Sequence, residues 1–459
     1  MAQGRMVGIA AQHAFPEGLL IGHVHDLSAA LAETRAALTE PGDVTLFEAA
    51  LRHAGILIRA DVLQRRGDHW RLIEVKSSTR VRDHQVTDAG IQNWVACGAG
   101  LHVERTELAY INNRFVYGGD GNYAGLFTHA DVSSAILPLQ DAIPEWIEAA
   151  QRDLAGPMPD VAVGPQCTDP FQCEFTAFCT PAAADYPVTI LPNGARLARQ
   201  LRDEGFADLR DIPVGRLDRA VHLRVWRATT NGRAEILPGA AAKLAALSWP
   251  RYFLDFETVG PAVPRWQGTR PYQKIPMQWS CHRQHADGTL DELAPFLSTT
   301  GADPRRGFAT ALLAAIGDIG PIVVYNAAFE RGVILELAGT FPDLASDLTA
   351  LAARIFDLLP IARDHYYHPA MMGSWSIKRV LPTVAPDLDY AQLGLVRSGD
   401  MVEPVYFEMI EAQTADARCE SIAKALLAYC ALDTLAMVRL ADFLASCDPL
   451  RPSAPPPTG

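Results

Sequence analysis

The stretch "YFLDFETVG", residues 252–260, decides the fold of the second half of the chain. Apolar residues flank Asp255 and Glu257, and the run ends at a glycine, which is typical of a β-strand. Residues two apart in a strand point to the same face, so the two carboxylates should lie side by side. Like charges this close repel unless a cation or a proton lies between them. The pair therefore lies either on the solvated face of an edge strand or in a divalent-metal site.

Composition narrows the class of protein. The chain has 459 residues, of which 49% are hydrophobic and 20% charged, with a net charge of −13. These values predict two or three globular domains and no broadly basic surface, so any contact with nucleic acid must be local or metal-bridged. No apolar run reaches the ~18 residues of a membrane span, and the N-terminus lacks a signal-peptide pattern. We expect a cytoplasmic protein without a membrane partner, whose eight cysteines are reduced or bind metal.

Hydrophobic periodicity predicts the order of the elements. Residues 20–40 show helical spacing, residues 44–77 look like strands, and a helix at 84–98 and a strand at 106–117 follow. Residues 156–188, rich in Pro, Cys and Ala, mark the end of a first domain, and a short helical segment follows at 197–213. In the second half we expect strands near 251–258, 275–284 and 290–297, a helix at 305–318, the strand "PIVVYN" and then mainly helices.

Three further residues of the second half could join the acid pair. Glu330 falls in the first turn of the helix that follows "PIVVYN". Tyr429 and Asp433 are four residues apart on a long amphipathic helix, hence on one face. An acid among Leu and Ala on the inner side of such a helix needs a partner. The alternative is that Asp433 lies on a solvent-exposed stripe of the helix.

Together these pieces resemble the DEDD superfamily of 3′–5′ exonucleases, in its tyrosine variant, over residues 250–445. The resemblance implies a ribonuclease-H-like fold in which Asp255, Glu257, Glu330 and Asp433 hold two Mg²⁺ or Mn²⁺ ions and Tyr429 orients the attacking water. Hard cations of this kind prefer oxygen ligands. Glu330 departs from the family, because most such exonucleases have aspartate there.

Two longer segments, "PRWQGTRPYQKIPMQWSCH" and "GSWSIKRVLP", resemble a bacterial family known mainly as an uncharacterised domain fused behind a RecB-like nuclease. In the second segment Lys378 is either a phosphate contact or a solvated helix lysine. Asp357, in "RIFDLLP", is either a supporting acid or a helix N-cap, and we favour the cap.

The first half contains its own acid pair. In "IRADVLQRRGDHWRLIEVKSS", Asp61 and Glu74 are equidistant from Gly67-Asp68, a dipeptide that suits the tip of a tight hairpin. The two acids should then face each other, with Lys76 on the same face as Glu74. This group is either a metal site or an exposed row of charges on the hairpin, in which Lys76 forms the ion pair with the acids.

This hairpin resembles the core of PD-(D/E)XK nucleases. The resemblance implies that Asp61 and Glu74 are metal ligands and that Lys76 positions water or stabilises charge on the phosphate. Gln92 matches the glutamine on the next helix of RecB-like members, and Glu48 matches their additional acid. His13 is a further candidate, for the metal-binding histidine of some relatives.

Cysteines follow this domain at equal intervals, in "CTDPFQCEFTAFC": Cys167, Cys173 and Cys179. Clustered thiolates in a reduced compartment suggest zinc or an iron–sulfur cluster. In the RecB-like nucleases that this domain resembles, three late cysteines join one near the N-terminus around a 4Fe–4S cluster. No fourth ligand is identified, since Cys97 is a poor substitute on the helix after Gln92. The other cysteines we expect to be buried thiols: Cys281, Cys419, Cys430 and Cys447.

The sequence thus predicts an α/β protein with a RecB-like PD-(D/E)XK domain at 1–182, a helical linker resembling a helix-hairpin-helix unit at 183–247, a ribonuclease-H-like exonuclease domain at 248–446 and a disordered tail at 447–459. The expected function is metal-dependent hydrolysis of phosphodiester bonds in single-stranded DNA or RNA. Two alternatives stay open. The chain could be a catalytically impaired platform that binds nucleic acid in a larger complex, or an enzyme of another class that uses a carboxylate metal site.

Overall fold

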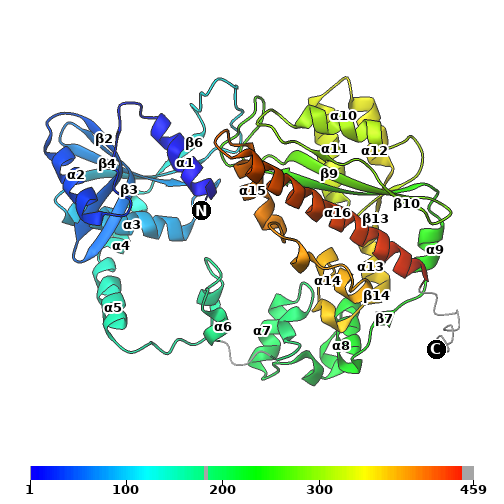
Figure 1. Cartoon of the computed structure of the whole chain (residues 1–459). Coiled ribbons are helices and arrows are strands. Elements are labelled where there is room, and N and C mark those ends of the chain that lie inside the picture. The colour runs from blue at the N-terminus through cyan, green and yellow to red at the C-terminus, as the bar shows by residue number, and fades with distance from the viewer. Residues whose placement is uncertain (1, 180–183, 447–459) are drawn as a thin grey trace. The chain divides into compact units, whose positions relative to one another are not determined.

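The computed structural model describes residues 2–179 and 184–446, which form two compact units of mixed α/β structure (Figure 1). Unit 1 comprises Met1–Thr180 and Gly260–Gln273, and unit 2 comprises Pro181–Val259 and Lys274–Gly459. The α/β class expected from the sequence is confirmed.

Unit 1 is built on a six-stranded mixed sheet whose strands follow the chain order. Strands β2 to β4 are antiparallel, and β4 runs parallel to β5, a pairing that requires the crossover helix α3. The strands are β1 (Leu19–Leu20), β2 (Val44–His53), β3 (Ile56–Arg66), β4 (His69–Lys76), β5 (Val103–Ile111) and β6 (Phe127–Asp131).

The hairpin of β3 and β4 turns at Gly67 and Asp68, as the sequence predicts. Gly67 has φ +59°, a conformation that glycine adopts without strain. The ladder runs from the pair nearest the turn, Arg66 with His69, to the pair Val62 with Ile73. The next position in this register places Asp61 opposite Glu74.

Helices α1 to α4 of unit 1 pack against this sheet. Ala37 of α2 and Val95 and Ala96 of α3 share one buried cluster with the strands. The strand expected at 106–117 ends earlier, at Ile111, because residues 112–117 form a loop. The helices are α1 (Ala2–His13), α2 (Leu27–Thr39), α3 (Asp83–Gly98), α4 (Ser133–Gln140), α5 (Ile143–Ala155) and α6 (Thr176–Cys179).

Residues 260–273 lie between two strands of unit 2 in the sequence but belong to unit 1. Ala262 and Val263 are buried in a cluster with apolar residues of the first half of the chain. Tyr123 Oη donates a hydrogen bond to the Pro264 carbonyl at 3.0 Å. The sequence predicts that this segment belongs to the domain at 248–446. The structure places it in unit 1, because its apolar side chains are buried there.

Unit 2 is built on a second mixed sheet, in the order β10-β9-β8-β12-β13, with β11 paired to β9. Strands β8, β9 and β10 are antiparallel neighbours, and β12 and β13 run parallel to β8. The strands are β8 (Arg251–Val259), β9 (Ile275–Gln284), β10 (Leu290–Glu292), β11 (Phe296–Leu297), β12 (Ile322–Val324) and β13 (Ile355–Asp357).

Helices cover both faces of this sheet (Figure 1). Alternate residues of β8, including Leu254 and Phe256, pack with α10, α11 and α12, whereas Phe253 packs in the cluster that contains α13 and α16. The helices after β8 are α10 (Arg305–Ala315), α11 (Ala328–Thr340), α12 (Ala345–Ala353), α13 (Leu358–His365), α14 (Ile377–Val384), α15 (Val402–Ile410) and α16 (Asp416–Ser446).

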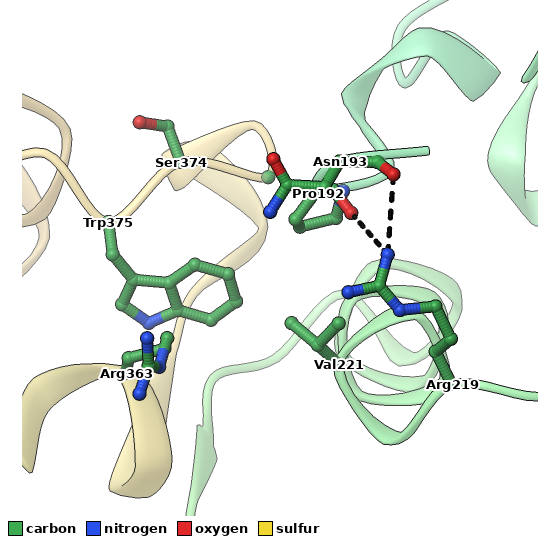
Figure 2. Close-up of a pocket in the computed structure, with 8 residues that line it drawn as sticks. Pro192, Asn193, Arg219, Val221, Arg363, Ser374 and Trp375 are labelled. Carbon is green, nitrogen blue, oxygen red and sulfur yellow. Dashed lines mark hydrogen bonds between the residues drawn. The ribbon is translucent and has the colours of Figure 1, made fainter. Parts of the chain in front are cut away.

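The region expected to be a linker at 183–247 is part of the core of unit 2. It contains α7 (Ala195–Asp203), α8 (Ala220–Asn231), β7 (Glu235–Ile236) and α9 (Ala240–Ala245), and β7 pairs with β14 (Tyr366–Tyr367). Leu201 and Val225 share a buried cluster with Leu440 of α16. Figure 2 shows the turn at Pro192 and Asn193 close to Ser374 and Trp375.

Helix α16 is long and apolar enough, by length and composition, to cross a membrane, and it is the only such helix among the described residues. Half of its most apolar window is buried inside the structure. Core helices pass the same test, so this feature is weak support for a membrane span.

Replacing Gly373 should test how closely residues 183–247 pack in unit 2. Gly373 has φ +73°, and a Cβ there would lie 1.7 Å from the carbonyl oxygen of Ile190. We expect Gly373→Ala to lower the free energy of unfolding by about 2–4 kcal/mol, measured by urea denaturation. The control is Gly339→Ala in α11, where a Cβ meets nothing within 4 Å, and which should be neutral or slightly stabilising. Equal stability of both variants would contradict this packing.

Candidate metal centre

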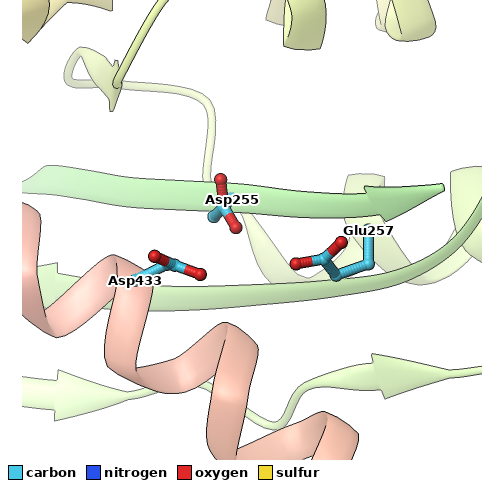
Figure 3. A group of neighbouring side chains, drawn as sticks. All are labelled: Asp255, Glu257 and Asp433. Carbon is cyan, nitrogen blue, oxygen red and sulfur yellow. The ribbon is translucent and has the colours of Figure 1, made fainter. Parts of the chain in front are cut away.

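Three carboxylates of unit 2 converge between β8 and α16 (Figure 3). Asp255 and Glu257 share one face of β8, the face opposite Leu254 and Phe256, and Asp433 approaches them from α16. One oxygen of each acid lies within 4.8 Å of the others. The structure thus brings together three of the four acids expected for this site.

Burial and mutual repulsion hold protons on this cluster. Burial, followed by the nearby charges of Asp433, Glu257 and Glu330, raises the pKa of Asp255 well above its usual range. Burial and then Asp433 raise the pKa of Glu257 to about 8. Burial also raises the pKa of Asp433 to about 6. At neutral pH the three acids need either protons or a cation to coexist.

Glu330 lies in the first turn of α11, as predicted, and its side chain is 2% exposed. Burial is the main reason that its pKa rises to about 8. Its Oε2 atom has no hydrogen-bond partner among the described residues. Glu330 is not within the close group of three acids, but its charge acts on Asp255. It is therefore the remaining candidate for an oxygen donor next to the cluster.

Asp357 caps helices rather than joining the acids, as favoured from the sequence. Its side chain accepts hydrogen bonds from the backbone N–H groups of Asn326, Ala327 and Leu359 at 3.0–3.1 Å. It is the N-cap of α13 and also orders the turn that leads into α11. Asp357 thereby positions the helix that carries Glu330.

Tyr429 and Lys378 complete one side of the centre. Tyr429 lies one helical turn before Asp433 on α16, and both residues are buried. Lys378 Nζ, at the start of α14, donates to Tyr429 Oη in a very short hydrogen bond. Its positive charge lowers the pKa values of Glu257 and Asp433. Burial, Asp433 and the acids of β8 raise the pKa of Tyr429, so its phenol stays neutral.

Tyr390 is a site residue that sequence reasoning missed. Its Oη donates to Asp433 Oδ1 at 2.5 Å. It lies in a short 3₁₀ turn, 43 residues before Asp433, and no spacing pattern connects the two. Cys430, expected to be a plain buried thiol, also contacts the cluster, because its Sγ lies 3.8 Å from Asp255 Oδ2.

The donor set of this cluster fits a hard divalent cation. All three close ligand atoms are carboxylate oxygens, and among the described residues no histidine or cysteine belongs to the group. Mg²⁺ and Mn²⁺ prefer such oxygen ligands. Asp255, Glu257 and Asp433 could hold the ion, with Glu330 nearby.

Unit 1 gathers a second set of charged residues at the β3–β4 hairpin. Asp61 Oδ2 accepts a hydrogen bond from the Val75 N–H at 2.7 Å, and Lys76 Nζ donates to Glu74 at 2.7 Å. Burial and then Glu74 raise the pKa of Asp61, and burial raises the pKa of Glu74. Gln92, on α3, is buried beside the Glu74 side chain and acts to lower the pKa of that carboxyl. The expected neighbourhood of Asp61, Glu74, Lys76 and Gln92 is thus present.

Glu48 occupies an interruption of the β2–β3 ladder, opposite Asp61. It has φ +55°, which is rare for a residue with a side chain, and its carboxylate pairs with Arg59 at 3.2 Å. The charge of Glu48 contributes to the raised pKa of Asp61. Backbone strain of this kind is concentrated at functional sites, so the interruption supports Glu48 as part of the group.

Sequence reasoning also missed Asp88. Lys76 Nζ donates to Asp88 Oδ2 at 2.5 Å. Asp88 precedes Gln92 by four residues on α3, so helical spacing could have placed it beside the site. His13, at the end of α1, forms no hydrogen bond or ion pair that connects it to these residues within the described part of unit 1.

The three late cysteines lie in the last segment of unit 1. Cys167 ends a 3₁₀ turn, Cys173 donates its N–H to the Cys167 carbonyl at 2.8 Å, and Cys179 ends α6. Each is a free thiol, and Cys97 on α3 is exposed. The iron–sulfur cluster stays a prediction without a fourth ligand. Cys447 lies outside the described residues.

Comparison with known proteins finds one family. Residues 252–376 match a family described as a domain of unknown function, DUF2779. This match includes Asp255, Glu257 and Glu330 and ends before Lys378. No curated protein and no solved structure matches the chain.

The stability of the metal-free protein should depend on pH through the acid cluster. A carboxyl whose pKa is raised on folding binds more protons in the folded state, so stability falls as pH rises between the two pKa values. For Glu257 this window runs from its ordinary pKa of 4.5 to the raised pKa of about 8. We expect the melting temperature in chelator to fall from pH 5 to pH 8, and Mn²⁺ to restore it.

Asp255→Asn provides the matched comparison, because it removes one of the repelling charges. This variant should be about 1–3 kcal/mol more stable than the unaltered protein at pH 8 in chelator and should lose the stabilisation by Mn²⁺. Identical melting curves of both proteins across this range would show that the acids do not repel as described.

Removing the Tyr390 hydroxyl should weaken metal binding in a pH-dependent way. The hydrogen bond from Tyr390 lowers the pKa of Asp433, so its loss leaves more of the protonated acid near pH 6.5. We expect Tyr390→Phe to raise the Mn²⁺ dissociation constant about 3–10-fold at pH 6.5 and much less at pH 8.5, by calorimetry. Tyr366→Phe removes a buried phenol that binds Thr383 instead and should leave the dissociation constant unchanged. An increase in the Mn²⁺ dissociation constant that is the same at pH 6.5 and pH 8.5 would exclude this role of the Tyr390 hydroxyl.

Proposed function

We propose that this protein is a metal-dependent nuclease, in which unit 2 hydrolyses phosphodiester bonds of DNA or RNA from the 3′ end. The observation that carries the proposal is the group formed by half-buried Asp255 and Glu257 and buried Asp433, with oxygens within 4.8 Å of one another. Three such acids are costly to bury without a cation, and hydrolysis of phosphodiesters is a common use of carboxylate-bound Mg²⁺ or Mn²⁺.

The topology of unit 2 supports a ribonuclease-H-like fold. Three consecutive antiparallel strands are followed by helix α10 and by two strands parallel to β8, with helices on both faces. In this arrangement the first strand is central and carries the two acids, and the last helix carries the third acid and the tyrosine. This is the constellation that the resemblance to tyrosine-type DEDD exonucleases implies.

The residues of this centre have distinct roles in the proposed reaction. When bound, the divalent ions polarise the phosphodiester and favour ionisation of water. Tyr429 stays neutral, and because Lys378 donates to its oxygen, its own O–H can orient the attacking water. Lys378 keeps a positive charge where negative charge builds up on the phosphate. Tyr390 holds Asp433 in position.

For unit 1 the proposal is a PD-(D/E)XK fold with a second nuclease centre at Asp61, Glu74 and Lys76. The mixed sheet, the hairpin that opposes the two acids and the glutamine on the following helix support it. Lys76 already pairs with both Glu74 and Asp88, so the charge of this group is partly compensated. We therefore assign the main hydrolytic activity to unit 2.

End-labelled single-stranded DNA and RNA test this assignment. With Mn²⁺ or Mg²⁺ the unaltered protein should produce a ladder that shortens from the 3′ end. Asp255→Asn should reduce the rate about 1,000-fold, because the acids stabilise the transition state only through the bound cation. Glu74→Gln should retain the ladder if unit 2 is the main centre.

Asp347→Asn on α12 is the matched control, since it removes an exposed acid of the same unit. It should behave like the unaltered protein. Loss of the ladder in Glu74→Gln alone would move the activity to unit 1. Binding of both nucleic acids in chelator without any hydrolysis in metal would instead favour a platform that binds but does not cleave.

A further inference from the structure

A cleft rich in arginine lies within unit 2, between the 190–222 region and the loop before α14. One hollow of about 540 Å³ is lined by Asn193, Arg219, Arg363, Ser374 and Trp375 (Figure 2). A second hollow of about 530 Å³ shares Asn193 and Arg219, and its other charged or ionisable lining residues are Arg196, Arg216, Asp218 and His222. Because the two hollows share residues, we treat them as one arginine cleft.

The charge of this cleft is positive in an acidic protein. Residues 193–227 contain eight arginines and five acidic residues, whereas the whole chain has a net charge of −13. Arg216 pairs with Glu204, and Arg363 makes only a 3.4 Å contact with Asp364 between exposed side chains. Within residues 184–446, Arg196 and Arg219 form no ion pair. Asp218 is the one acid among the residues that line the two hollows, against the four arginines Arg196, Arg216, Arg219 and Arg363, so the cleft keeps a net positive charge.

Hydrogen bonds within the protein hold Arg219 and His222 in the wall of the arginine cleft. Arg219 Nη1 donates to the carbonyls of Pro192 and Asn193 at 3.4 and 3.3 Å. His222 is 1% exposed, and its Nε2 donates to the Pro192 carbonyl at 3.0 Å. Figure 2 shows the side chains of Arg219 and Arg363 on opposite sides of the hollow. A wall held in this way loses little conformational entropy on binding.

A short segment of chain, from Trp375 to Lys378, links the wall of the cleft to the acid cluster. Trp375 lines the cleft, and its carbonyl accepts a hydrogen bond from Tyr325 Oη at 2.5 Å, at the end of β12. Lys378, three residues further along, reaches Tyr429 in the metal centre. Three residues span at most about 10–11 Å. The backbone at Trp375, on the cleft wall, therefore lies within about 10–11 Å of the backbone at Lys378, beside the acids.

We propose that the arginine cleft binds the phosphodiester backbone of the single strand whose 3′ end enters the acid cluster, an inference that rests on the proposed hydrolytic function. Guanidinium groups match phosphate oxygens geometrically, and unpaired arginines in a groove bind a strand without regard to its sequence. The short distance along the chain between the cleft wall and a carboxylate group that fits a divalent cation favours nucleic acid over an acidic peptide. The cleft sets how firmly the strand is held, and the acids carry out the cleavage.

The test measures binding of fluorescein-labelled oligo(dT) and oligo(U) to the full chain by anisotropy in chelator, where cleavage does not occur. The test variant is Arg196→Gln/Arg363→Gln, which spares the wall residues Arg219 and His222. We expect about a tenfold loss of affinity. The plot of log affinity against log salt should become shallower by about 1.4, or about 0.7 for each lost phosphate contact.

The control is Arg306→Gln/Arg418→Gln, which removes two exposed arginines of unit 2 outside the cleft. It should keep the affinity and the salt dependence. Equal affinity and salt dependence of the cleft variant and the unaltered protein would overturn the proposal, as would equal competition by poly-glutamate and unlabelled oligo(dT).

A small substrate separates this inference from the proposed function. Hydrolysis of bis(p-nitrophenyl) phosphate with Mn²⁺ needs the acid cluster but not the cleft, so the cleft variant should retain it and Asp255→Asn should lose it. If the unaltered protein hydrolyses neither this substrate nor any strand while the cleft variant still loses affinity, the hydrolytic function fails and the strand-binding cleft stands. The cleft variant could instead lose both melting temperature and the rate of bis(p-nitrophenyl) phosphate hydrolysis. Its lost affinity for the strand would then reflect misfolding, and the inference would fail.

Discussion

The repulsion among three carboxylates, one of them buried and two half-buried, is the constraint on which the arrangement of unit 2 depends. Asp255 and Glu257 cannot move apart, because the pleat of β8 places them on one face while Leu254 and Phe256 are held in the core on the other. Asp433 cannot move away either, since α16 is anchored in the core by buried residues on both sides of it, such as Leu426 and Leu440. The surrounding groups reduce this repulsion only in part. Tyr390 donates one hydrogen bond to Asp433, and Lys378 supplies one positive charge.

Local periodicity explains which features could be predicted from the sequence. The acid pair of β8, the pair of Tyr429 and Asp433 and the hairpin of Asp61 and Glu74 each follow from a fixed repeat of a strand or a helix. The strands expected along the chain of unit 2 and the position of Glu330 in the first turn of α11 agree with the same kind of reasoning. These features depend on residues close in sequence, or on the alternation of side chains between the two faces of a strand, one of which is buried.

Contacts across long stretches of sequence could not be predicted in this way. Tyr390 meets Asp433 only because a 3₁₀ turn is packed against α16, and no repeat connects the two. Residues 183–247 read as a linker because their helices are short and rich in charge. Their apolar positions, such as Leu201 and Val225, complete the core of unit 2 once it has formed. Residues 260–273 are a similar case, since Ala262 and Val263 find their partners in unit 1.

The two candidate centres differ in how their charge is balanced, and this difference bears on what each can do. In unit 1, Lys76 lies between Glu74 and Asp88, and Arg59 pairs with Glu48, so two cations of the protein already meet three of its acids. In unit 2, Lys378 donates its hydrogen bond to Tyr429 rather than to a carboxylate, and the pKa of Glu257 still rises to about 8. A centre that compensates its own acids gains less from a bound cation than one that leaves them in repulsion. The acid cluster of β8 and α16 is therefore the stronger site for a divalent ion, and unit 1 must first release Lys76 from its carboxylates to match it.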